Sequence, residues 1–268
     1  MHTLRRTVRL VVNPAATTPT PPNETRGRNG YAGKPAMTGL GAFYELEVAC
    51  RGEPDAATGY LIDIKVIDNA ARGVVAPRIE AGARTGGDPA AILAGAMGPL
   101  AAALRPVELD SARLRLSPYY AVEMSTDNGQ RVLIRQRFDF AAAHRLHVET
   151  LSDDENRRLF GKCNNPSGHG HNYQIEPCVE CDPADPIDLA QLEAIVEEVV
   201  IERFDHKHLN IDTDEFNTEK GGVNPSVENI ARVSHELLSG PVASAGARLV
   251  STTVWETDRT AATYAPRP

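Results

Sequence analysis

The chain has 268 residues with 28 basic and 36 acidic side chains, which gives a formal net charge of -8 and room for one large domain or two ordinary ones. The acidic balance argues against nonspecific binding to nucleic acids and to membrane surfaces, because both are polyanionic. Neither a signal-peptide core nor a membrane-spanning apolar run is present. We therefore expect a cytoplasmic protein that partners neither nucleic acid nor membrane and keeps its cysteines reduced.

The first half of the chain alternates between strand and helix patterns. Residues 13–38 are rich in Pro, Thr, Gly and Asn and indicate a loop. Asp88 and Pro89 mark a helix start, and Asp127-Asn128-Gly129 suits a tight hairpin turn. Apolar spacing predicts strands at 7–12 and 42–50, helices at 60–75 and 90–104, and strands at 113–124 and 131–140.

The second half repeats this order. An acidic, polar segment at 151–156 separates the strand at 131–140 from the next strand, and Asn224-Pro225 opens the second helix. The predicted elements are a strand at 168–179, a helix at 187–201, a helix after 225, and strands at 247–256 and 260–264. Each half therefore reads as strand, strand, helix, helix, strand.

Residue matches between the halves indicate a duplication. Gly33-Lys34 parallels Gly161-Lys162, and Ile62-Asp63-Ile64 parallels Ile187-Asp188-Leu189. We predict a first module at 1–128 and a second at 129–268. Only one strand, 131–140, lies where the end of one module and the start of the next require two, so either that strand is shared or one module is trimmed.

The densest chemistry lies in the second module. Residues two apart in a strand project to the same face, so His169 and His171 converge on one point. His144, in another strand-like run, supplies a third imidazole, and Cys163 lies a short loop upstream. Three protein nitrogens with an open fourth position are typical of a catalytic zinc site.

The corresponding residues are missing from the first module. Pro35 stands in place of Cys163, and Leu40 and Ala42 stand in place of the two histidines. The sequence therefore predicts a degenerate first module without metal or catalytic residues.

Three further clusters each allow a functional and a purely structural interpretation. Asp205 beside His206 suits an oriented proton-transfer pair, or a simple helix-end loop. Glu228 at a helix start suits a polar ring, or ordinary capping. Glu256 interrupts an apolar strand, either as a ligand contact or as a solvent-facing position.

Taken together, these motifs resemble the 6-pyruvoyltetrahydropterin synthase and 6-carboxytetrahydropterin synthase family. The resemblance covers roughly residues 129–264 and rests on Phe140-x-x-x-His144, Gly161-Lys162-Cys163, His169-Gly170-His171-Asn172-Tyr173, Asp205-His206-Lys207-x-Leu209-Asn210, Pro225-Ser226-Val227-Glu228-Asn229 and Glu256-Thr257. It implies an α+β class of tandem tunnelling-fold modules, each a four-stranded antiparallel sheet with two helices on one face. It also implies Zn²⁺ and the substrate 7,8-dihydroneopterin triphosphate.

The resemblance assigns roles residue by residue. His144, His169 and His171 would bind zinc, Cys163 would be the catalytic thiol, and Asp205 and His206 would relay its proton. Glu256 would anchor the pterin, and Glu228 is a weaker match for a second pterin contact, because Ser226-Val227 departs from the family's pair of small polar residues. The basic residues Arg157, Arg158 and Lys162 are candidates for the triphosphate.

The expected activity is that of a zinc-dependent lyase that eliminates triphosphate and rearranges the side chain. The product, 6-carboxy-5,6,7,8-tetrahydropterin on the route to queuosine or 6-pyruvoyl-tetrahydropterin, stays open. We expect a closed homo-oligomer with sites between subunits, because unpaired sheet edges need partners.

Two alternatives compete with this interpretation. In a non-catalytic assembly module, Cys163 would close a structural zinc site as the fourth ligand. A redox function would rest on Cys178 and Cys181, although no helix N-terminus follows them to stabilise a thiolate. His147 and His235 have no evident partners in the sequence and are interpreted as surface residues.

Overall fold

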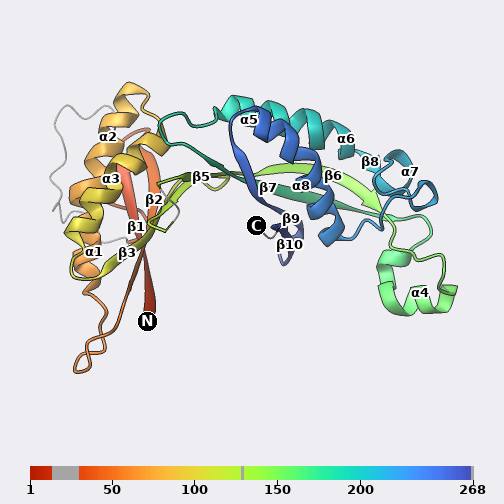
Figure 1. Cartoon of the computed structure of the whole chain (residues 1–268), viewed down its shortest axis with the longest axis horizontal. Coiled ribbons are helices and arrows are strands. Elements are labelled where there is room, and N and C mark those ends of the chain that lie inside the picture. The colour runs from red at the N-terminus through yellow and green to blue at the C-terminus, as the bar shows by residue number, and fades with distance from the viewer. Residues whose placement is uncertain (14–29, 128–129, 267–268) are drawn as a thin grey trace. The chain divides into compact units, whose positions relative to one another are not determined.

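A computed structural model describes residues 1–13, 30–127 and 130–266 (Figure 1). Most of the loop predicted at 13–38 and the Asn128-Gly129 part of the predicted turn lie outside these residues. The chain divides into two compact units. The first comprises Met1–Ile134 with Cys181–Pro186, and the second comprises Arg135–Glu180 with Ile187–Pro268. None of the helices in the described residues combines the length and apolar character that a membrane span requires.

The first unit is built on an antiparallel meander of four strands. Its strands are β1 (His2–Val12), β2 (Ala42–Gly52), β3 (Glu108–Ser117) and β4 (Tyr120–Ser125), each paired with the next. The helices α1 (Ile64–Ala70), α2 (Ala76–Thr85) and α3 (Pro89–Ala103) pack against this sheet. Apolar side chains from both layers, among them Leu46, Ile67, Leu93 and Leu114, are buried between them.

The first helix differs from its prediction at both ends. The Asp63 carboxylate accepts the Lys65 N–H, so the helix starts at Ile64 and not at residue 60. A π-helical turn, Ala71–Val75, then joins α1 to α2, and helical structure continues to Thr85. Pro77 falls in the first turn of α2, where its missing N–H costs least.

The single strand predicted at 113–124 is wrong, because this segment is a hairpin of β3 and β4. Pro118 lies at the turn, where its missing backbone N–H removes no hydrogen bond from the strand ladder. The segment 131–140 likewise contains two strands, β5 (Val132–Gln136) and the start of β6 (Phe138–His144). Neither predicted explanation for the missing strand is therefore needed, since the first unit closes with its own hairpin.

The second unit repeats the antiparallel arrangement. Its strands β6, β7 (His169–Cys181), β9 (Arg248–Thr257) and β10 (Thr260–Tyr264) pair in that order, and the two-residue β8 (Lys207–His208) pairs with β6 in parallel. Its long helices are α5 (Leu189–Val196), continued by a π-helical turn and α6 (Glu202–Phe204), and α8 (Val227–Ser244). The predicted α+β class, with a four-stranded antiparallel sheet and helices in each module, is confirmed.

The two units share an uncommon local feature. Asp63 caps α1 in one unit and Asp188 caps α5 in the other, and a π-helical turn follows each of these helices. The π-helical turn is rare in proteins, so its presence in both units supports a duplicated module.

The polar segment at 151–156 is not a simple loop. It begins α4 (Asp153–Phe160), because Ser152 and Glu155 form a reciprocal capping box. The Ser-x-x-Glu spacing is visible in the sequence and was the signal for this helix. After α4, a 3₁₀ turn (Gly161–Asn164) carries Cys163 back toward the sheet.

Candidate active site

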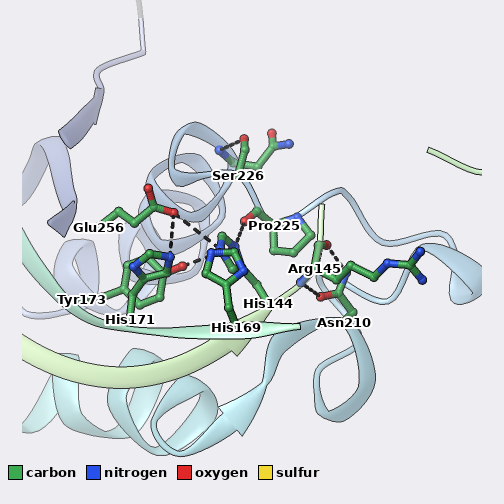
Figure 2. Close-up of polar contacts among 10 residues, drawn as sticks. His144, Arg145, His169, His171, Tyr173, Asn210, Pro225, Ser226 and Glu256 are labelled. Carbon is green, nitrogen blue, oxygen red and sulfur yellow. Dashed lines mark hydrogen bonds and ion pairs between the residues drawn. The ribbon is translucent and has the colours of Figure 1, made fainter. Parts of the chain in front are cut away.

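Three imidazoles converge in the second unit, as predicted. In the register of β6 and β7, His144 lies opposite His169 and Ala142 lies opposite His171, so alternation places all three histidines on one face of the sheet. Their ligand atoms all lie within 4.8 Å of one another (Figure 2). The three histidines that lie together are those that the sequence spacing predicted.

His144 is held in one tautomer by its surroundings. The side chain is fully buried, and its Nδ1 lies 2.7 Å from the Pro225 carbonyl oxygen, which can only accept a hydrogen bond. Burial lowers the pKa of His144 to about 4, so the ring is neutral at pH 7. The proton is therefore on Nδ1, and the Nε2 lone pair faces the Nε2 of His169 at 3.3 Å.

The donor set suits a metal ion. Within the described residues, the buried Nδ1 of His169 and Nε2 of His171 have no hydrogen-bond partner. Nitrogen lone pairs crowded together repel unless a proton or a cation lies between them. A second hydrogen bond that fixes the tautomer of a ligand, as Pro225 does for His144, is common in metal sites. The three histidines could thus hold a metal and leave a further position open.

Glu256 lies directly beside this cluster. Its Oε1 is 3.5 Å from the Nε2 of His144 and from the Nε2 of His171. Glu256 belongs to β9, which pairs with β7 and so brings the carboxylate to the histidines. The carboxylate therefore faces the cluster and not the solvent.

Cys163 lies near the cluster but outside the group of converging ligand atoms. That group comprises the three histidines alone among the residues that the structure describes. The Leu146 N–H donates to the Cys163 carbonyl oxygen at 2.8 Å, which ties the 3₁₀ turn to the segment after β6. Burial, with the nearby Glu256 carboxylate, raises the pKa of the Cys163 thiol.

Asp205 and His206 form an oriented pair at the end of α6. The Asp205 carboxylate lies 2.6 Å from the Nδ1 of His206 and accepts the Ala141 N–H at 2.7 Å. The Ala141 carbonyl accepts the N–H of His206, whose backbone φ is 55°. The Ala141 hydrogen bond and then His206 lower the pKa of Asp205. The His206 side chain is 83% exposed.

The relay pair and the thiol attach to the backbone at different points. The His206 N–H donates to the Ala141 carbonyl oxygen, and the Cys163 carbonyl oxygen accepts the Leu146 N–H. Leu146 follows Ala141 by five positions. Ala141 lies within β6, whereas Leu146 lies two residues beyond the end of β6 at His144. None of the described contacts joins the side chains of His206 and Cys163, so the proton relay between them stays a prediction.

Glu228 and its neighbours occupy the start of α8. Ser226 accepts the N–H of Asn229, which is ordinary capping. Glu228 is exposed in the first helical turn. Among the described contacts, none joins Glu228 to the histidine cluster.

Several residues that the sequence left without a role support the site. The side chain of Asn210 accepts the Arg145 N–H and donates to the Arg145 carbonyl oxygen (Figure 2). His147 is not a free surface residue, because its Nδ1 contacts Arg145 and Asn164. His235 is buried against Thr252 and the ring of Tyr264, so its predicted surface position is wrong. Apart from the contact between Arg145 and His147, these contacts join residues 17 to 65 positions apart, which leaves no local signal in the sequence.

The redox interpretation loses its structural basis. Cys178 and Cys181 are both buried within β7 and form no disulfide. Residues three apart in a strand lie roughly 10 Å apart along the chain. A disulfide needs Cα atoms within about 7 Å, so this pair cannot cycle without breaking the strand.

Among its described residues, the first unit has no counterparts to the histidines and the carboxylate of the candidate site. Leu40 is fully exposed, and Ala42 occupies the position in β2 that His171 occupies in β7. In the hairpin of β3 and β4, Leu116 stands where Glu256 stands in the hairpin of β9 and β10. The carboxylate is therefore missing together with the histidines.

Comparisons with known proteins agree with these observations. Residues 133–267 match the model of the family described as 6-pyruvoyl tetrahydropterin synthase. The chain is 44% identical over 115 residues to the human 6-pyruvoyl tetrahydrobiopterin synthase, covering 40% of this chain and 77% of that protein. A putative Caenorhabditis elegans 6-pyruvoyl tetrahydrobiopterin synthase is 41% identical over 138 residues, which is 50% of this chain and 94% of that protein.

A solved structure is also similar. It is the Caenorhabditis elegans 6-pyruvoyl tetrahydropterin synthase, with 35% sequence identity and a TM-score of 0.46, covering 51% of this chain and 96% of that one. The family predicted from the motifs is confirmed by the sequence matches.

Proposed function

Because the chain belongs to the 6-pyruvoyl tetrahydropterin synthase family, we propose that it is a zinc-dependent lyase that converts 7,8-dihydroneopterin triphosphate to 6-pyruvoyl-tetrahydropterin. The change is an elimination with internal rearrangement, in which the atoms of the substrate divide between the pterin product and inorganic triphosphate. The observation that carries the proposal is the histidine cluster with Glu256 at its edge.

His144, His169 and His171 would hold the zinc. Bound there, zinc supplies Lewis acidity toward oxygen atoms of the substrate side chain. The chain itself does the rest. Pro225 keeps the Nε2 of His144 free for the cluster, and the burial of this imidazole excludes competing water.

Glu256 would bind the pyrimidine edge of the pterin. One carboxylate can accept two adjacent N–H groups in a bidentate, charge-assisted pair. Since Oε1 of Glu256 lies 3.5 Å from two of the histidines, a ring bound to Glu256 lies next to the cluster. Glu228, exposed at the start of α8, is the weaker candidate for a second pterin contact.

Cys163 would move the carbon-bound proton, and Asp205 with His206 would relay it. In this proposal the relay pair comes from a second copy of the chain, because the two groups attach to distant points of one strand segment. The exposure of His206 suits such a role. The chain would then act as a homo-oligomer, with the first module as a structural wall lacking metal and catalytic residues.

The alternative of a structural zinc is less well supported. It requires Cys163 as a fourth ligand, yet the cluster of ligand atoms within 4.8 Å contains only histidines among the described residues. The arrangement favours an open position.

Product identification tests the proposal. The zinc-loaded full chain is incubated with 7,8-dihydroneopterin triphosphate, and the pterin and phosphate products are measured by mass spectrometry. We expect 6-pyruvoyl-tetrahydropterin and inorganic triphosphate in equal amounts. A 6-carboxytetrahydropterin product would move the chain to the queuosine branch, and no turnover by the zinc-loaded chain would favour the structural alternative.

A further inference from the structure

Arg145 differs from the other half-buried arginines of the second unit. Arg135 and Arg137 pair with Glu176, and Arg232 pairs with Glu236. For Arg145 the described residues supply no carboxylate partner, and this absence is the difference, because the buried Nε atoms of Arg135, Arg137 and Arg145 all have no hydrogen-bond partner. In a chain with a net charge of -8, an arginine left unpaired beside the candidate site is available to an anionic ligand.

The backbone of Arg145 is fixed at both polar groups. Asn210 accepts its N–H at 2.8 Å and donates to its carbonyl oxygen at 2.9 Å, as Figure 2 shows. Arg145 directly follows His144, the buried member of the histidine cluster. The two hydrogen bonds from Asn210 therefore fix the backbone position from which the Arg145 side chain extends. This lowers the entropic cost of binding a ligand.

His147 has a defined tautomer next to this guanidinium. Arg145 donates to its Nδ1 at 3.2 Å, and the Nδ2 of Asn164 donates to the same nitrogen at 3.1 Å. The second hydrogen of that amide goes to the Leu146 carbonyl oxygen, which fixes the orientation of the amide. Because Nδ1 accepts twice, the ring proton is on Nε2, and the described residues provide no acceptor for it.

We propose that Arg145 and His147 form an anion subsite that binds the phosphate chain of the substrate, with Asn210 and Asn164 as positioning residues. This inference rests on the proposed function for the identity of the phosphate ligand. The guanidinium offers a planar fork of N–H donors for phosphate oxygens, and the Nε2–H of His147 adds another. Asn164 follows Cys163 directly, so the subsite joins the segments that carry His144 and the thiol.

The subsite replaces the candidates taken from the sequence. Arg157 forms an ion pair with Asp154, which compensates its charge. Arg158 and Lys162 are exposed, and long exposed side chains hold a ligand weakly. These two residues would attract the anion from solution without fixing it.

Binding of inorganic triphosphate tests the subsite. Titration calorimetry is done with the zinc-loaded full chain, and zinc content is measured afterwards because triphosphate chelates zinc. Arg145→Met should weaken binding at least about tenfold, the loss expected for a bidentate charged contact. Arg145→Lys should give a smaller loss, because it keeps the charge without the fork. His147→Phe, which removes the Nε2 donor, should weaken binding about threefold or more.

Arg232→Met is the matched control, since it removes a half-buried arginine that is already paired with a carboxylate. It should bind triphosphate like the unmodified chain. Unchanged triphosphate binding by Arg145→Met with its zinc retained would overturn the proposal. A loss of binding in Arg158→Ala but not in Arg145→Met would also overturn it.

Steady-state kinetics separate this inference from the proposed function. If the chain turns over the pterin substrate, Arg145→Met should raise KM by the same factor that it raises the Kd for triphosphate. Turnover with an unchanged KM would leave the function standing and remove the subsite. Binding of triphosphate through Arg145 without any turnover would leave the subsite standing and remove the function.

Discussion

The side chains around the histidine cluster differ in what they contribute. His144 is a buried, neutral imidazole with its proton fixed by Pro225, whereas His171 faces Glu256 across 3.5 Å. Cys163 lies outside the converging ligand atoms in the described part of the chain. At this scale, metal binding and proton transfer are therefore separable, and single substitutions can test each.

Removal of one histidine should release the metal. His171→Ala leaves two imidazoles, and two nitrogens rarely hold zinc tightly. We expect zinc content, measured by mass spectrometry of the purified protein, to fall from about one per chain to a small fraction, with activity reduced roughly a thousandfold or more. His2→Ala, an exposed histidine of the first unit, is the control. Full zinc occupancy in His171→Ala would refute the ligand assignment.

Removal of the Cys163 thiol should leave the metal in place and lower turnover. Cys163→Ala leaves the three histidines intact, so zinc and fold should be retained, while turnover falls about 10²- to 10⁴-fold with the loss of a proton-transfer group. Zinc analysis and circular dichroism accompany the activity assay. A loss of zinc together with activity would instead support the closed structural site.

Two local contacts, each with a side chain, lie at the ends of elements that carry the candidate site. Gly168, just before β7, has a φ of +70°, and a Cβ placed there would lie 2.5 Å from the Nε2 of His208. The end of α6 is tied to β6 through the Asp205 carboxylate. Both contacts couple the position of an element to one residue.

Gly168→Ala should destabilise the second unit. Both the positive φ and the contact with His208 oppose a side chain, so we expect a loss of roughly 2–3 kcal/mol. Gly246→Ala is the matched control, because Gly246 has a φ of +81° but nothing within 4 Å of its Cβ position. Urea unfolding should show the smaller loss for Gly246→Ala. Equal losses would mean that His208 moves freely and does not limit the turn.

The Asp205 contact should make stability depend on pH. Its pKa is lowered in the folded chain, so its contribution is present above the unfolded value of about 3.9 and is lost as the pH falls through the folded pKa. Asp205→Asn should cost about 1 kcal/mol at pH 7 and progressively less toward pH 3. Urea unfolding at several pH values measures this, with the exposed Asp258→Asn as control. A cost that is constant with pH would contradict the role of the carboxylate charge.

The whole molecule contains two modules but one set of site residues. In the described sheet, the only strand partner of β1 is β2, although Leu10 also forms an isolated bridge with Lys34, and β10 pairs only with β9. Each unit therefore has an edge strand without a second strand partner. Such edges are usually paired or covered in native proteins. These edges are the reason for the prediction of a closed homo-oligomer whose sites combine residues from two chains.

Mixing of inactive variants tests this arrangement. Cys163→Ala and His206→Ala should each be inactive, but after subunit exchange at equal amounts about a quarter of the sites should combine an intact Cys163 with an intact His206. Activity of the mixture is compared with that of each variant, and light scattering gives the oligomer mass. A mixture as inactive as its components would place the relay within one chain, and a fully active monomer would remove the need for a second copy.

Local patterns determined much of this protein. The His-x-His spacing with an upstream histidine identified the cluster, because strand alternation converts spacing directly into a shared face. The matching segments at Asp63 and Asp188 are the signal on which the predicted duplication rests. The hairpin at Pro118 and the capping box at Ser152 were also present as local signals, although the strand at 113–124 was predicted, and 151–156 was described only as an acidic, polar segment, without them.

Only the tertiary structure decided which distant residues meet. The hydrogen bond from His144 to Pro225 and the Asn210 clamp on Arg145 join positions separated by 81 and 65 residues. The separation of Cys163 from His206 likewise depends on where each attaches along the segment of β6. Such contacts arise from how sheets and helices pack, and packing depends on the whole chain and not on the spacing within any one motif.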